Sequence, residues 1–565
     1  MIKKFSAIDT KNILAFLQNK TNDFENKIAL GIRTQYGWNE FSYKGIGLLS
    51  RKIANWMINC ASLLRGDRVA ILSESKPEFG ACFFASALSC TVFTPLDIKL
   101  TIHELLSILS DCRPRVIFVS NSYYNMALEL KNRLDFIEHI VLLDDTQSDA
   151  DITTVYNIEN KYDIKFRRPH LRSTAILIYT SGTTGAAKGV EITYLNMLSQ
   201  IDSLDWVRKY VFPDYDVNSD IAVLSILPMN HLFELTVGFS LFMNWGLSIY
   251  YTNSLRPKDI LSTMREKNIR FMIVVPAFLK LLKSAIENKI ASLSRFQKLK
   301  FKFAYTFAAL IPFTFFRRLL FKDIHKNFGS KFSGCITGGA PLDISVGKFF
   351  ERIGIKVYHG YGLSETSPVV AVNCEKRKNL ASVGHPLKCF EAKCDPKTGE
   401  LLLRGLSVMK GYYNRPDLTN QVIDKDGWLH TGDIAKIDKD GFLYITGRIK
   451  NMIVLSGGKK VFPEEVEAVL EKSPFFSEIC VFGVSVQTGA KEGCEDIAAA
   501  VYPAQDIINL PDCEKIIREQ IKLLSQKLAP YKRPTNIYIL KDPLPRTTTK
   551  KVKRKDLKEL IGTVI

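Results

Sequence analysis

The sequence predicts an α/β protein: a large amino-terminal domain of two α/β subdomains and a small β-barrel, followed by a small α+β carboxy-terminal domain. Three observations predict this class. The chain has 565 residues, more than one hydrophobic core usually organises. Short apolar runs alternate with helix-length segments over its first part, which is typical of βαβ units on parallel sheets. After Ser382 the pattern changes to short strands separated by Asp/Gly turns.

The first α/β subdomain is expected between about Asn22 and Leu171. The apolar runs Arg68–Leu72 and Arg115–Val119 predict buried strands, and the segments Lys44–Cys60 and Glu78–Ser89 have the length of helices. Strands that alternate with helices in this way predict a parallel sheet covered by helices.

The same alternation recurs from Ala175 to about Gly360 and predicts a second α/β subdomain. Its buried strands are expected at Ala222–Leu227, Phe271–Val275 and Phe332–Thr337. Two α/β layers are therefore expected to pack together in the large domain.

The small β-barrel is expected from short strands such as Gly399–Gly405 and from the turn-rich segment Asp438–Tyr444. A fresh mixed pattern begins after Gly447–Lys450. We therefore place the domain boundary at Lys450, so that the large domain comprises residues 1–449.

The small carboxy-terminal domain is expected over residues 450–565. Helical periodicity runs over Pro463–Glu471 and Cys513–Leu528. Together with the short strands between them, these segments predict a mixed α+β domain.

Composition limits the class of partner. Hydrophobic residues make up 46% and charged residues 24% of the chain, so a folded globular protein is expected. The formal net charge of +19 predicts a surface that attracts nucleotide phosphates or anionic lipid. The chain has neither an arginine-rich tail nor a basic run interleaved with stacking aromatic residues, so we expect no nucleic-acid partner.

The cysteines and the apolar runs of the sequence predict the cellular location of the protein. The eleven cysteines include no CxxC pair, so we expect reduced, buried residues of a cytoplasmic protein instead of zinc or dithiol ligands. Met1–Lys4 is followed by no apolar stretch, which argues against a signal peptide. The longest apolar runs, Ala81–Pro95 and Phe303–Phe316, are shorter than the roughly 20 residues that span a bilayer.

Tyr179–Val190 carries the clearest chemical signal. Its sequence, YTSGTTGAAKGV, follows the apolar run Ala175–Ile178. Glycines let the backbone turn tightly and bring N–H groups against a phosphate, while hydroxyl groups and a lysine add donors and charge. The spacing from glycine to lysine differs from that of a Walker A loop. We therefore predict a phosphate-binding loop of another kind; the alternative is an ordinary Ser/Thr/Gly turn.

This segment resembles the YTSGTTGxPKGV signature of the adenylate-forming superfamily of acyl-CoA synthetases, luciferases and nonribosomal-peptide adenylation domains, with Ala187 where proline is usual. Further segments match in order, from Gly66–Val69 to the carboxy-terminal end, so the resemblance covers nearly the whole chain. It implies an acyl-CoA synthetase-like fold with a mobile carboxy-terminal domain, and it implies ATP and Mg²⁺ as cofactors. The loop residues that would hold the nucleotide are Thr180, Ser181, Gly182, Thr183, Thr184, Gly185 and Lys188.

The resemblance also implies an acid site and an adenine site. Leu227–His231 is similar to an LPxxH segment whose histidine, here His231, lies beside the acyl pocket and the attacking carboxylate. The next residues, Leu232–Leu235, are similar to long-chain fatty-acid members. Thr337–Leu342 and Tyr358–Thr366 resemble the paired adenine segments. The nucleotide-binding residues implied there are Gly338, Gly339, Ala340, Tyr361, Gly362 and Thr366.

Mg²⁺ is expected on Glu365 and Thr184, because this ion prefers hard oxygen ligands. Tyr361 would offer an aromatic face to the adenine. Taken singly, a tyrosine of this kind is more often a core aromatic residue and a glutamate more often a surface charge. Their order and spacing favour the functional interpretation.

The ribose and thiol sites are implied by later segments. Asp433, at the end of Trp428–Asp433, would accept hydrogen bonds from both ribose hydroxyls with its two oxygens. Arg448 would hold ribose and phosphate, and Lys450 occupies the hinge position. Gly457 and Gly458 would line the tunnel for the pantetheine of CoA, or for the phosphopantetheine of an acyl carrier protein.

The catalytic lysine is implied by Leu544–Arg554, which resembles a PRTxxGKxxR segment. Alignment on Pro545 and Arg554 assigns the role to Lys551. Lys550 stands where glycine is usual, so it competes for the role. A solvated basic tail or a nuclear address is a further alternative for this lysine-rich stretch.

The implied reaction is ATP-dependent activation of a long-chain fatty acid through acyl-AMP, with transfer to CoA and release of AMP and pyrophosphate. Loading of an acyl carrier protein, or ligation of an aryl or short-chain acid to CoA, remains open. Outside this class, a luciferase-type oxidase or a non-catalytic nucleotide sensor is the alternative. The catalytic residues would be Lys551, Glu365 and His231.

The segment Phe303–Lys331 places aromatic and aliphatic residues next to Arg317, Arg318, Lys322 and Lys326. Such a segment suits peripheral contact with anionic lipid at the inner face of a membrane. An ordinary core helix with a solvated end is the alternative, and Pro312 would interrupt any single long helix.

Overall fold

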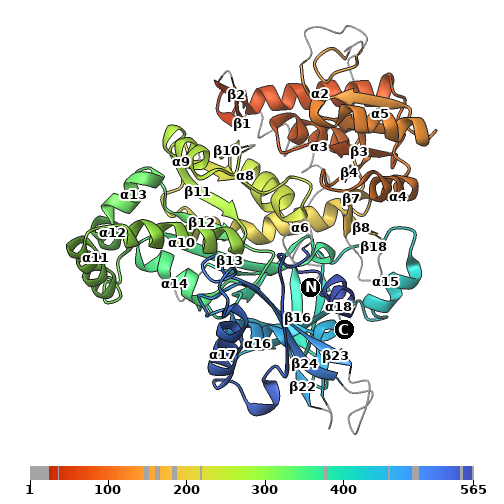
Figure 1. Cartoon of the computed structure of the whole chain (residues 1–565). Coiled ribbons are helices and arrows are strands. Elements are labelled where there is room, and N and C mark those ends of the chain that lie inside the picture. Colours follow the sequence, from red (N-terminus) through yellow and green to blue (C-terminus); the bar gives the residue numbers. More distant parts are fainter. Residues whose placement is uncertain are drawn as a thin grey trace. The chain divides into compact units, whose positions relative to one another are not determined.

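The chain folds into two compact units (Figure 1). The first unit comprises Met1–Glu391 and Arg404–Gly427, and the second comprises Ala392–Leu403 and Trp428–Ile565. The computed structural model describes residues 24–35, 37–145, 152–158, 166–180, 187–216, 219–252, 254–374, 379–455, 459–485, 495–546 and 552–562.

A nine-stranded sheet forms one half of the first unit, in the order β15-β14-β13-β12-β11-β9-β10-β1-β2. Neighbours from β13 to β1 pair in parallel, while β2, β14 and β15 pair antiparallel. Its strands are β1 (Ile28–Thr34), β2 (Gly37–Ser42), β9 (Ala222–Ser225), β10 (Ser248–Tyr251), β11 (Ile269–Val274), β12 (Gly334–Thr337), β13 (Lys356–Gly362), β14 (Val369–Asn373) and β15 (His385–Pro386).

A seven-stranded sheet forms the other half, in the order β18-β8-β7-β4-β3-β5-β6. Its central neighbours pair in parallel, and β8 pairs antiparallel with β7 and β18. Its strands are β3 (Arg68–Leu72), β4 (Val92–Pro95), β5 (Val116–Val119), β6 (His139–Leu142), β7 (Thr174–Thr180), β8 (Lys188–Thr193) and β18 (Gly411–Tyr412). The two α/β layers predicted from the sequence are confirmed.

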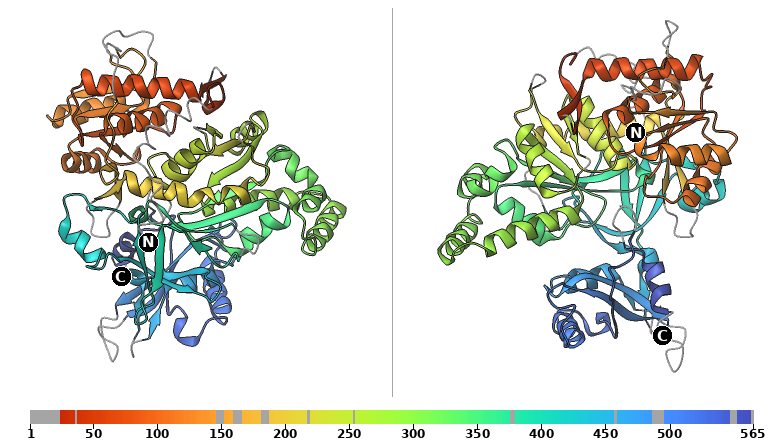
Figure 2. Two further views of the ribbon diagram at one scale, coloured as in Figure 1. Left: turned by 180° about the vertical axis from the view of Figure 1, so that it is seen from behind. Right: turned by 45° about the horizontal axis from the view of Figure 1, so that its top comes forward.

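Helices of the first unit connect and cover these sheets (Figure 2). Local chemistry fixes several starts: Thr101 and Glu104 form a capping box at α4, and Pro77 begins α3, which is buried throughout. The α-helices are α2 (Tyr43–Asn59), α3 (Pro77–Ser89), α4 (Ile102–Cys112), α5 (Tyr124–Arg133), α6 (Tyr194–Asp205), α7 (Arg208–Val211), α8 (Phe242–Asn244), α9 (Pro257–Glu266), α10 (Pro276–Ala291), α11 (Arg295–Phe307), α12 (Thr314–Leu320), α13 (Lys322–Phe328), α14 (Ile344–Arg352) and α15 (Pro416–Val422). Short helices of other types are η2 (Asn121–Tyr123), the π-helix η3 (Glu234–Leu241) and η4 (Ser364–Thr366).

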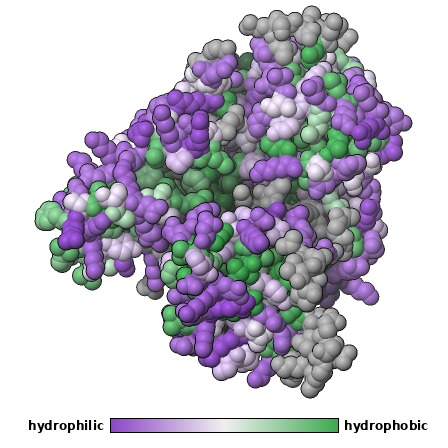
Figure 3. All heavy atoms as spheres, in the orientation of Figure 1, coloured by the Kyte–Doolittle hydropathy of each residue, from purple (hydrophilic) through white to green (hydrophobic). Residues whose placement is uncertain are grey.

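One part of the first unit carries large hydrophobic side chains on its surface (Figure 3). They belong to α10, α11, α12 and the residues that join α11 to α12. Phe296 is 77% exposed, Leu310 79% and Phe315 70%. The packing of the first unit therefore leaves a large apolar surface exposed to solvent at these helices.

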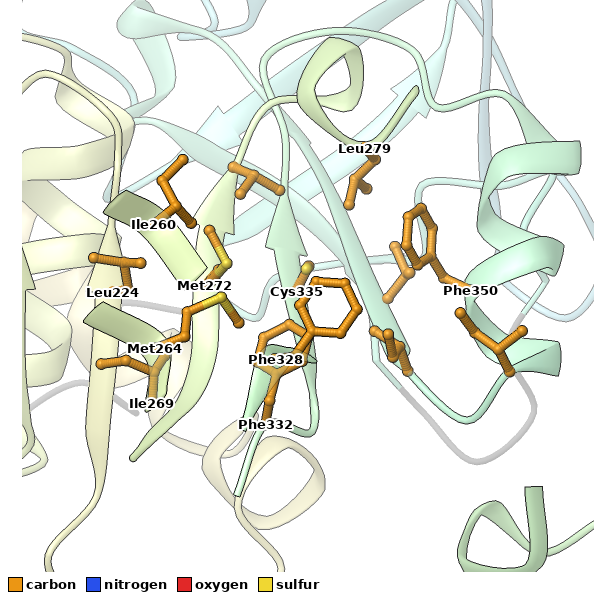
Figure 4. Close-up of a cluster of buried hydrophobic side chains, with 14 of the residues drawn as sticks. Leu224, Ile260, Met264, Ile269, Met272, Leu279, Phe328, Phe332, Cys335 and Phe350 are labelled. Carbon is orange, nitrogen blue, oxygen red and sulfur yellow. The ribbon is translucent and has the colours of Figure 1, made fainter. Parts of the chain in front are cut away.

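A core cluster of the first unit lies at the nine-stranded sheet (Figure 4). Leu224, Met272 and Cys335 project from neighbouring strands, and Met264, Phe328 and Phe350 come from the helices that cover them. This packing fixes the strand ends from which the candidate site is built.

The second unit contains a four-stranded sheet in the order β16-β17-β19-β20, where we expected a small β-barrel. A three-stranded sheet, β23-β24-β25, and the β21-β22 pair follow. The strands are β16 (Phe390–Cys394), β17 (Glu400–Gly405), β19 (Leu429–Ile437), β20 (Leu443–Arg448), β21 (Ile453–Val454), β22 (Lys460–Val461), β23 (Phe476–Ser485), β24 (Glu495–Pro503) and β25 (Asn536–Ile539). The helices are η5 (Ile449–Asn451), α16 (Pro463–Leu470), α17 (Cys513–Ser525), η6 (Pro530–Lys532) and α18 (Arg554–Gly562).

Contacts assign residues 392–403 and 428–449 to the second unit, so packing divides the chain before Lys450. A division by packing does not test where a rotation would take place, and the hinge at Lys450 stays a prediction. None of the helices in the described ranges combines the length and the hydropathy that crossing a bilayer requires.

Candidate active site

The predicted phosphate loop connects two paired strands. β7 ends at Thr180, β8 begins at Lys188, and these two residues are partners in the antiparallel ladder. The pairing holds both ends of the connection together, so the loop starts and returns at one point of the sheet. The loop residues that lie outside the described residues are Ser181, Gly182, Thr183, Thr184 and Gly185.

The two predicted adenine segments leave adjacent parallel strands. Thr337, the last residue of β12, is the partner of His359 in β13. Gly338–Ala340 and Tyr361–Gly362 therefore follow this pair along the same edge of the sheet, where ligands of parallel α/β sheets bind. The Nε2 atom of His359 lies 3.3 Å from the carbonyl oxygen of Ala340 and links the two segments. Burial lowers the pKa of His359, which favours a neutral imidazole in this position.

Two glycines of these segments are required by the backbone. Gly339 has φ +80°, a conformation that residues with a side chain rarely adopt. A Cβ atom on Gly362 would lie 1.7 Å from the carbonyl oxygen of Pro368. Only glycine therefore fits at position 362. Its lack of a side chain lets the backbone around η4 lie close to the end of β13.

Thr366 is fully buried and holds the turn that follows Gly362. Its Oγ1 accepts the N–H of Leu363 at 2.9 Å and lies 2.8 Å from the carbonyl oxygen of Pro368. The side chain thus stabilises the backbone that presents Glu365. Its predicted contact with nucleotide stays a prediction.

Tyr412 links two of the predicted functional residues. Its hydroxyl donates a hydrogen bond to Oε1 of Glu365 at 2.9 Å. The Nζ atom of Lys188 lies 5.3 Å from the centre of the Tyr412 ring, within the range of a cation–π contact. Burial, reinforced by the Glu365 carboxylate, raises the pKa of Tyr412, so the hydroxyl stays protonated and donates. A carboxylate and an ammonium group are therefore placed around one tyrosine at the base of the phosphate loop.

His231 is half-buried and immediately precedes an apolar helical segment. The carbonyl oxygen of His231 accepts the N–H of Leu235 at 3.0 Å, and the π-helix η3 begins at Glu234. Phe233 approaches Gly338: its Cζ atom is 3.4 Å from the place that a Cβ on Gly338 would take. The residues that follow the LPxxH segment therefore lie next to the first predicted adenine segment, and the role of His231 stays a prediction. π-Helical turns occur often at functional sites.

Glu234 is a buried carboxyl group next to His231 in sequence. Within the described residues its oxygens accept no hydrogen bond of ordinary geometry. Burial raises its pKa to about 8, and the nearby Ser225 hydroxyl opposes this shift more weakly. The group is therefore neutral at physiological pH, and sequence reasoning did not single it out.

In the second unit, Asp433 and Arg448 form a pair. They are partners in the β19–β20 ladder, and Nε of Arg448 lies 2.7 Å from Oδ1 of Asp433. Asp433 is buried, whereas the Arg448 side chain is 48% exposed. Both predicted ribose residues thus lie at one place on the sheet, with the arginine open to solvent.

Glu400 orders the segment before Asp433. Its Oε1 accepts the N–H of Gly432 at 2.8 Å, and its Oε2 lies 3.0 Å from Nδ1 of His430. Thr431 donates to the carbonyl oxygen of Leu401 at 2.7 Å, so the whole segment is tied to β17. In the sequence, Glu400 lies in a predicted strand, and no motif there indicates a function for it.

Both ends of the predicted catalytic segment are anchored within the second unit. Arg546 and Val552 form an antiparallel bridge, and Arg546 lies 3.0 Å from Glu478. Arg554, three residues after Lys551, binds both oxygens of Glu467 at 2.6 and 2.7 Å. Lys551 and its rival Lys550 lie outside the described residues, as do Gly457 and Gly458. The anchors define a short connection that begins and ends at the β23 side of the three-stranded sheet.

A family model for the AMP-binding enzyme matches residues 17–413, well over half of the chain. The chain belongs to the AMP-binding enzyme family. A second model, for the AMP-binding enzyme C-terminal domain, matches residues 465–551 and covers the anchored segment up to Lys551. The predicted superfamily is confirmed, and with it an adenylate-forming ligase of the acyl-CoA synthetase type.

Curated members of the AMP-binding family match nearly the whole chain. A long-chain-fatty-acid–CoA ligase from Escherichia coli O157:H7 is 27% identical over 90% of this chain and 88% of its own length. A luciferin 4-monooxygenase from Photuris pensylvanica is 26% identical over 88% of this chain and 86% of its own. The family therefore includes relatives with different chemistry after adenylation.

Solved structures of the family share the fold. ATP-bound MatB from Rhodopseudomonas palustris superposes with a TM-score of 0.76 at 23% identity and covers 98% of this chain and 99% of its own. The o-succinylbenzoate CoA synthetase MenE from Bacillus subtilis, in complex with its acyl-adenylate intermediate, has a TM-score of 0.74 at 23% identity, with coverage of 96% and 97%. The predicted acyl-CoA synthetase-like fold class is confirmed.

Sequence reasoning did not single out three residues that lie in or beside the candidate segments: Tyr412, Glu400 and Glu234. The first two act through contacts with residues far away in the sequence, which no local motif contains. Glu234 lies three residues after His231 in an apolar run. A charged residue inside such a run is the feature of the sequence that could have indicated its importance.

Proposed function

We propose that this enzyme activates a long-chain fatty acid as acyl-AMP and transfers the acyl group to CoA, releasing AMP and pyrophosphate. The observation that carries the proposal is the placement of Glu365 and Lys188 around Tyr412 at the base of the loop between β7 and β8. A metal-ligating carboxylate and a phosphate-binding ammonium group are the two charges that this chemistry needs. The names of the full-length relatives and the segment Leu232–Leu235 favour a fatty substrate.

In the first step, an oxygen of the fatty carboxylate attacks the α-phosphorus of ATP. A bond from that oxygen to phosphorus forms, and the bond to the bridging oxygen of the β-phosphate breaks, so that pyrophosphate leaves with the electron pair. The acid is already ionised at neutral pH, so it needs no general base. It needs relief of the repulsion between two anions, which fixed positive groups supply.

The chain offers these groups from several segments. Lys188 and the hydroxyl-rich loop hold the departing phosphates, and Lys551 bridges the carboxylate and the α-phosphate. Glu365 and Thr184 would hold Mg²⁺, which would neutralise phosphate charge there. The hard carboxylate oxygens of Glu365 fit this ion, since Oε1 already accepts a hydrogen bond from Tyr412 and is thereby held in place.

Other predicted residues orient the two substrates. Gly338–Ala340 and Tyr361 hold adenine, Asp433 accepts the ribose hydroxyls, and Arg448 contacts ribose and phosphate. His231, beside the first adenine segment, positions the attacking carboxylate. The contact between Phe233 and Gly338 supports this placement, because it sets the acid segment against the nucleotide segment.

In the second step, the thiolate of CoA attacks the acyl carbon, the carbon–sulfur bond forms, and AMP leaves. The lysine that assists the first step must withdraw to admit the thiol. Rotation of the carboxy-terminal domain about Lys450 achieves this, and Gly457 and Gly458 then border the pantetheine. Lys450 is exposed and lies in η5, the short helix that directly follows β20, a position that suits such a hinge.

A second candidate is ligation of an aromatic acid to CoA. Two structural neighbours favour it by their titles: MenE, and an anthranilate CoA ligase in complex with anthranoyl-AMP. These neighbours are under 25% identical to this chain, so they speak for the fold more than for the substrate.

The substrate assignment is tested by measuring pyrophosphate release with acids of graded chain length and with benzoates, each with and without CoA. The proposal predicts CoA-dependent turnover that peaks at long chains. A maximum at benzoate or acetate would overturn the substrate assignment and leave adenylation intact. CoA-independent light emission with oxygen would instead place the protein with the luciferases.

A further inference from the structure

The segment from α10 to α12 forms a fixed platform with an exposed outer face. On its inner side, Phe301, Ala304 and Tyr305 of α11 pack against the core cluster of the nine-stranded sheet. The ring of Phe301 lies 5.5 Å from that of Phe321, and the ring of Tyr305 lies 5.9 Å from that of Phe349. α11 therefore has a set orientation, and its opposite side faces outward.

That opposite side is apolar. Phe296, Leu299, Phe303 and Phe307 recur at helical spacing, so they form one stripe along α11, and each is more than half exposed. Phe313, Phe315, Phe316 and Leu319 of α12 and its approach continue the apolar surface. We name these eight side chains the outer apolar face.

The outer apolar face stands at an edge of the first unit. α11 and α12 lie at the end of this unit in Figure 1, and both views of Figure 2 show the same green helices at its periphery. Figure 3 shows hydrophobic side chains at this edge among hydrophilic ones. Apolar patches of this extent are rare on monomeric surfaces and mark contact with a partner or a membrane.

The charges around the face have one sign. From Asn288 to Lys322 the sequence contains no Asp or Glu. Arg295, Lys298 and Lys302 lie along one edge of the apolar stripe of α11, Lys300 lies along the other, and all four are exposed. The charge thus borders the apolar stripe on both sides, which is the arrangement of helices that lie in the headgroup region of a bilayer.

The structure corrects the choice of basic residues made from the sequence. Arg317 donates to the carbonyl oxygens of Ile311 at 2.7 Å and Glu351 at 3.0 Å. Arg318 donates to those of Phe332 and Ser330, and burial lowers the pKa of its guanidinium. Both arginines therefore hold the platform together, and Lys298, Lys300 and Lys302 are the charges free to meet a partner.

We propose that the outer apolar face is a docking surface for a bilayer containing anionic lipid. The aromatic and aliphatic side chains enter the interface between headgroups and acyl chains, and the bordering lysines contact anionic headgroups. A second copy of the chain fits less well, because pairing this face with itself would bring two acid-free, basic surfaces together.

Vesicle co-sedimentation of the full chain, without ATP or acid, tests the proposal independently of catalysis. Vesicles of phosphatidylcholine with phosphatidylglycerol are compared with vesicles of phosphatidylcholine alone. The expected result is strong binding to the anionic vesicles and weaker binding at high salt, since surface charges are screened. Sedimentation that is equally weak with both kinds of vesicle overturns the proposal.

Three variants localise the contact. Phe296→Gln/Phe303→Gln/Phe307→Gln should lower binding to anionic vesicles more than about tenfold, because each phenylalanine contributes by burial of apolar area. Lys298→Glu/Lys300→Glu/Lys302→Glu should lower it similarly and abolish the preference for anionic lipid. The matched control, Leu48→Gln/Leu64→Gln/Leu523→Gln, removes equally exposed side chains elsewhere and should bind as the parent does.

Far-ultraviolet circular dichroism and thermal unfolding show whether each variant is folded; all substituted side chains are exposed, so the midpoint should stay within about 2 °C of the parent. Parental binding by the phenylalanine variant contradicts the proposal. A parent that is dimeric by light scattering, with the phenylalanine variant monomeric, assigns the face to a second copy and also contradicts it.

Discussion

Tyr412 connects the metal-ligating candidate Glu365 to the phosphate-binding candidate Lys188. The contact explains how a carboxylate on η4 keeps a fixed orientation although its own segment is short. Tyr412 lies in β18, whose ladder partner β8 begins at Lys188, so sheet pairing brings these two side chains together, and the hydrogen bond from Tyr412 adds Glu365. We assign Tyr412 the role of a positioning residue.

Tyr412→Phe should reduce the rate of ATP–pyrophosphate exchange by about tenfold, because a hydrogen bond to a charged group is typically worth about 1.5–3 kcal/mol. The apparent KM for the acid should not change, since the hydroxyl contacts Glu365 and not the acyl site. Tyr444→Phe is the matched control: it removes a tyrosine hydrogen bond to Asp438, also of 2.9 Å, away from the candidate site. Equal losses in the two variants would refute the positioning role.

We expect Glu234 to make the free energy of unfolding depend on pH. Its carboxyl has an ordinary pKa of 4.5 in the unfolded chain and about 8 in the folded protein. Between these values the folded protein holds a proton that the unfolded chain has lost, so stability falls as the pH rises. The loss reaches at most about 4 kcal/mol near pH 8, at 1.4 kcal/mol per pKa unit.

Glu234→Gln keeps the size of the side chain and removes the titration. The free energy of unfolding of this variant, measured by urea denaturation, should decline less than that of the parent from about pH 5 to about pH 8. Glu129→Gln, at an exposed position of α5, serves as the control and should follow the parent profile. Parallel profiles for Glu234→Gln and the parent would show that the buried carboxyl is not the source of the dependence.

Among secondary-structure elements, β25 and α18 flank the connection that contains the candidate lysines of the second unit. The ion pair of Arg554 and Glu467 is partly buried, and Glu467 also accepts the N–H of Val481 at 2.7 Å. The pair therefore joins α18, α16 and β23, and it holds one end of the connection that carries Lys550 and Lys551. Burial raises the pKa of Glu467, and the charge of Arg554 opposes this effect.

Arg554→Met should destabilise the protein by about 2–3 kcal/mol, because it leaves a partly buried carboxylate without its charged partner. Arg554→Met/Glu467→Met removes both charges and should recover much of that stability. If the pair positions the lysine segment, the adenylation rate of the double variant stays low although its unfolding midpoint recovers. Arg518→Met, which breaks an exposed pair with Glu514, is the control and should change stability by less than about 0.5 kcal/mol.

Much of the element pattern was predictable because apolar periodicity is a local property. The predicted strand Arg68–Leu72 is β3 without change, and α2 and α3 match the predicted helices within one residue. β9 ends at Ser225, two residues before the expected Leu227, since the Ser225 hydroxyl accepts the N–H of Leu227 at 3.4 Å and begins a turn. The π-helix η3 was not predictable, because an apolar run of that length does not reveal its helical type.

Candidate residues could be chosen from the sequence where one motif contains them, as for Lys188, Glu365 and Asp433, and their functions stay predictions. Tyr412 and Glu400 acquire their roles by strand pairing over long sequence separations, and a single sequence carries no such information. The structure also separates the basic residues around Phe303–Lys331 into arginines that hold backbone carbonyls and lysines that face outward, which no sequence pattern distinguishes.

For the molecule as a whole, the residues that we propose for nucleotide chemistry come from both compact units. Glu365, Tyr412 and Lys188 belong to the first, and Asp433 and Arg448 belong to the second. The second unit also anchors the connection that carries Lys551. The central claim is that this connection supplies the ammonium group that stabilises negative charge at the α-phosphorus during adenylation.

The most direct measurement is ATP–pyrophosphate exchange, without CoA, in Lys551→Ala, in Lys550→Ala and in the double variant, with Lys553→Ala as the control for charge. The account predicts a loss of about a hundredfold or more in Lys551→Ala and in the double variant, comparable to removal of a group that stabilises a transition-state charge, and near-parental exchange in Lys553→Ala. Parental exchange in the double variant would contradict the central claim.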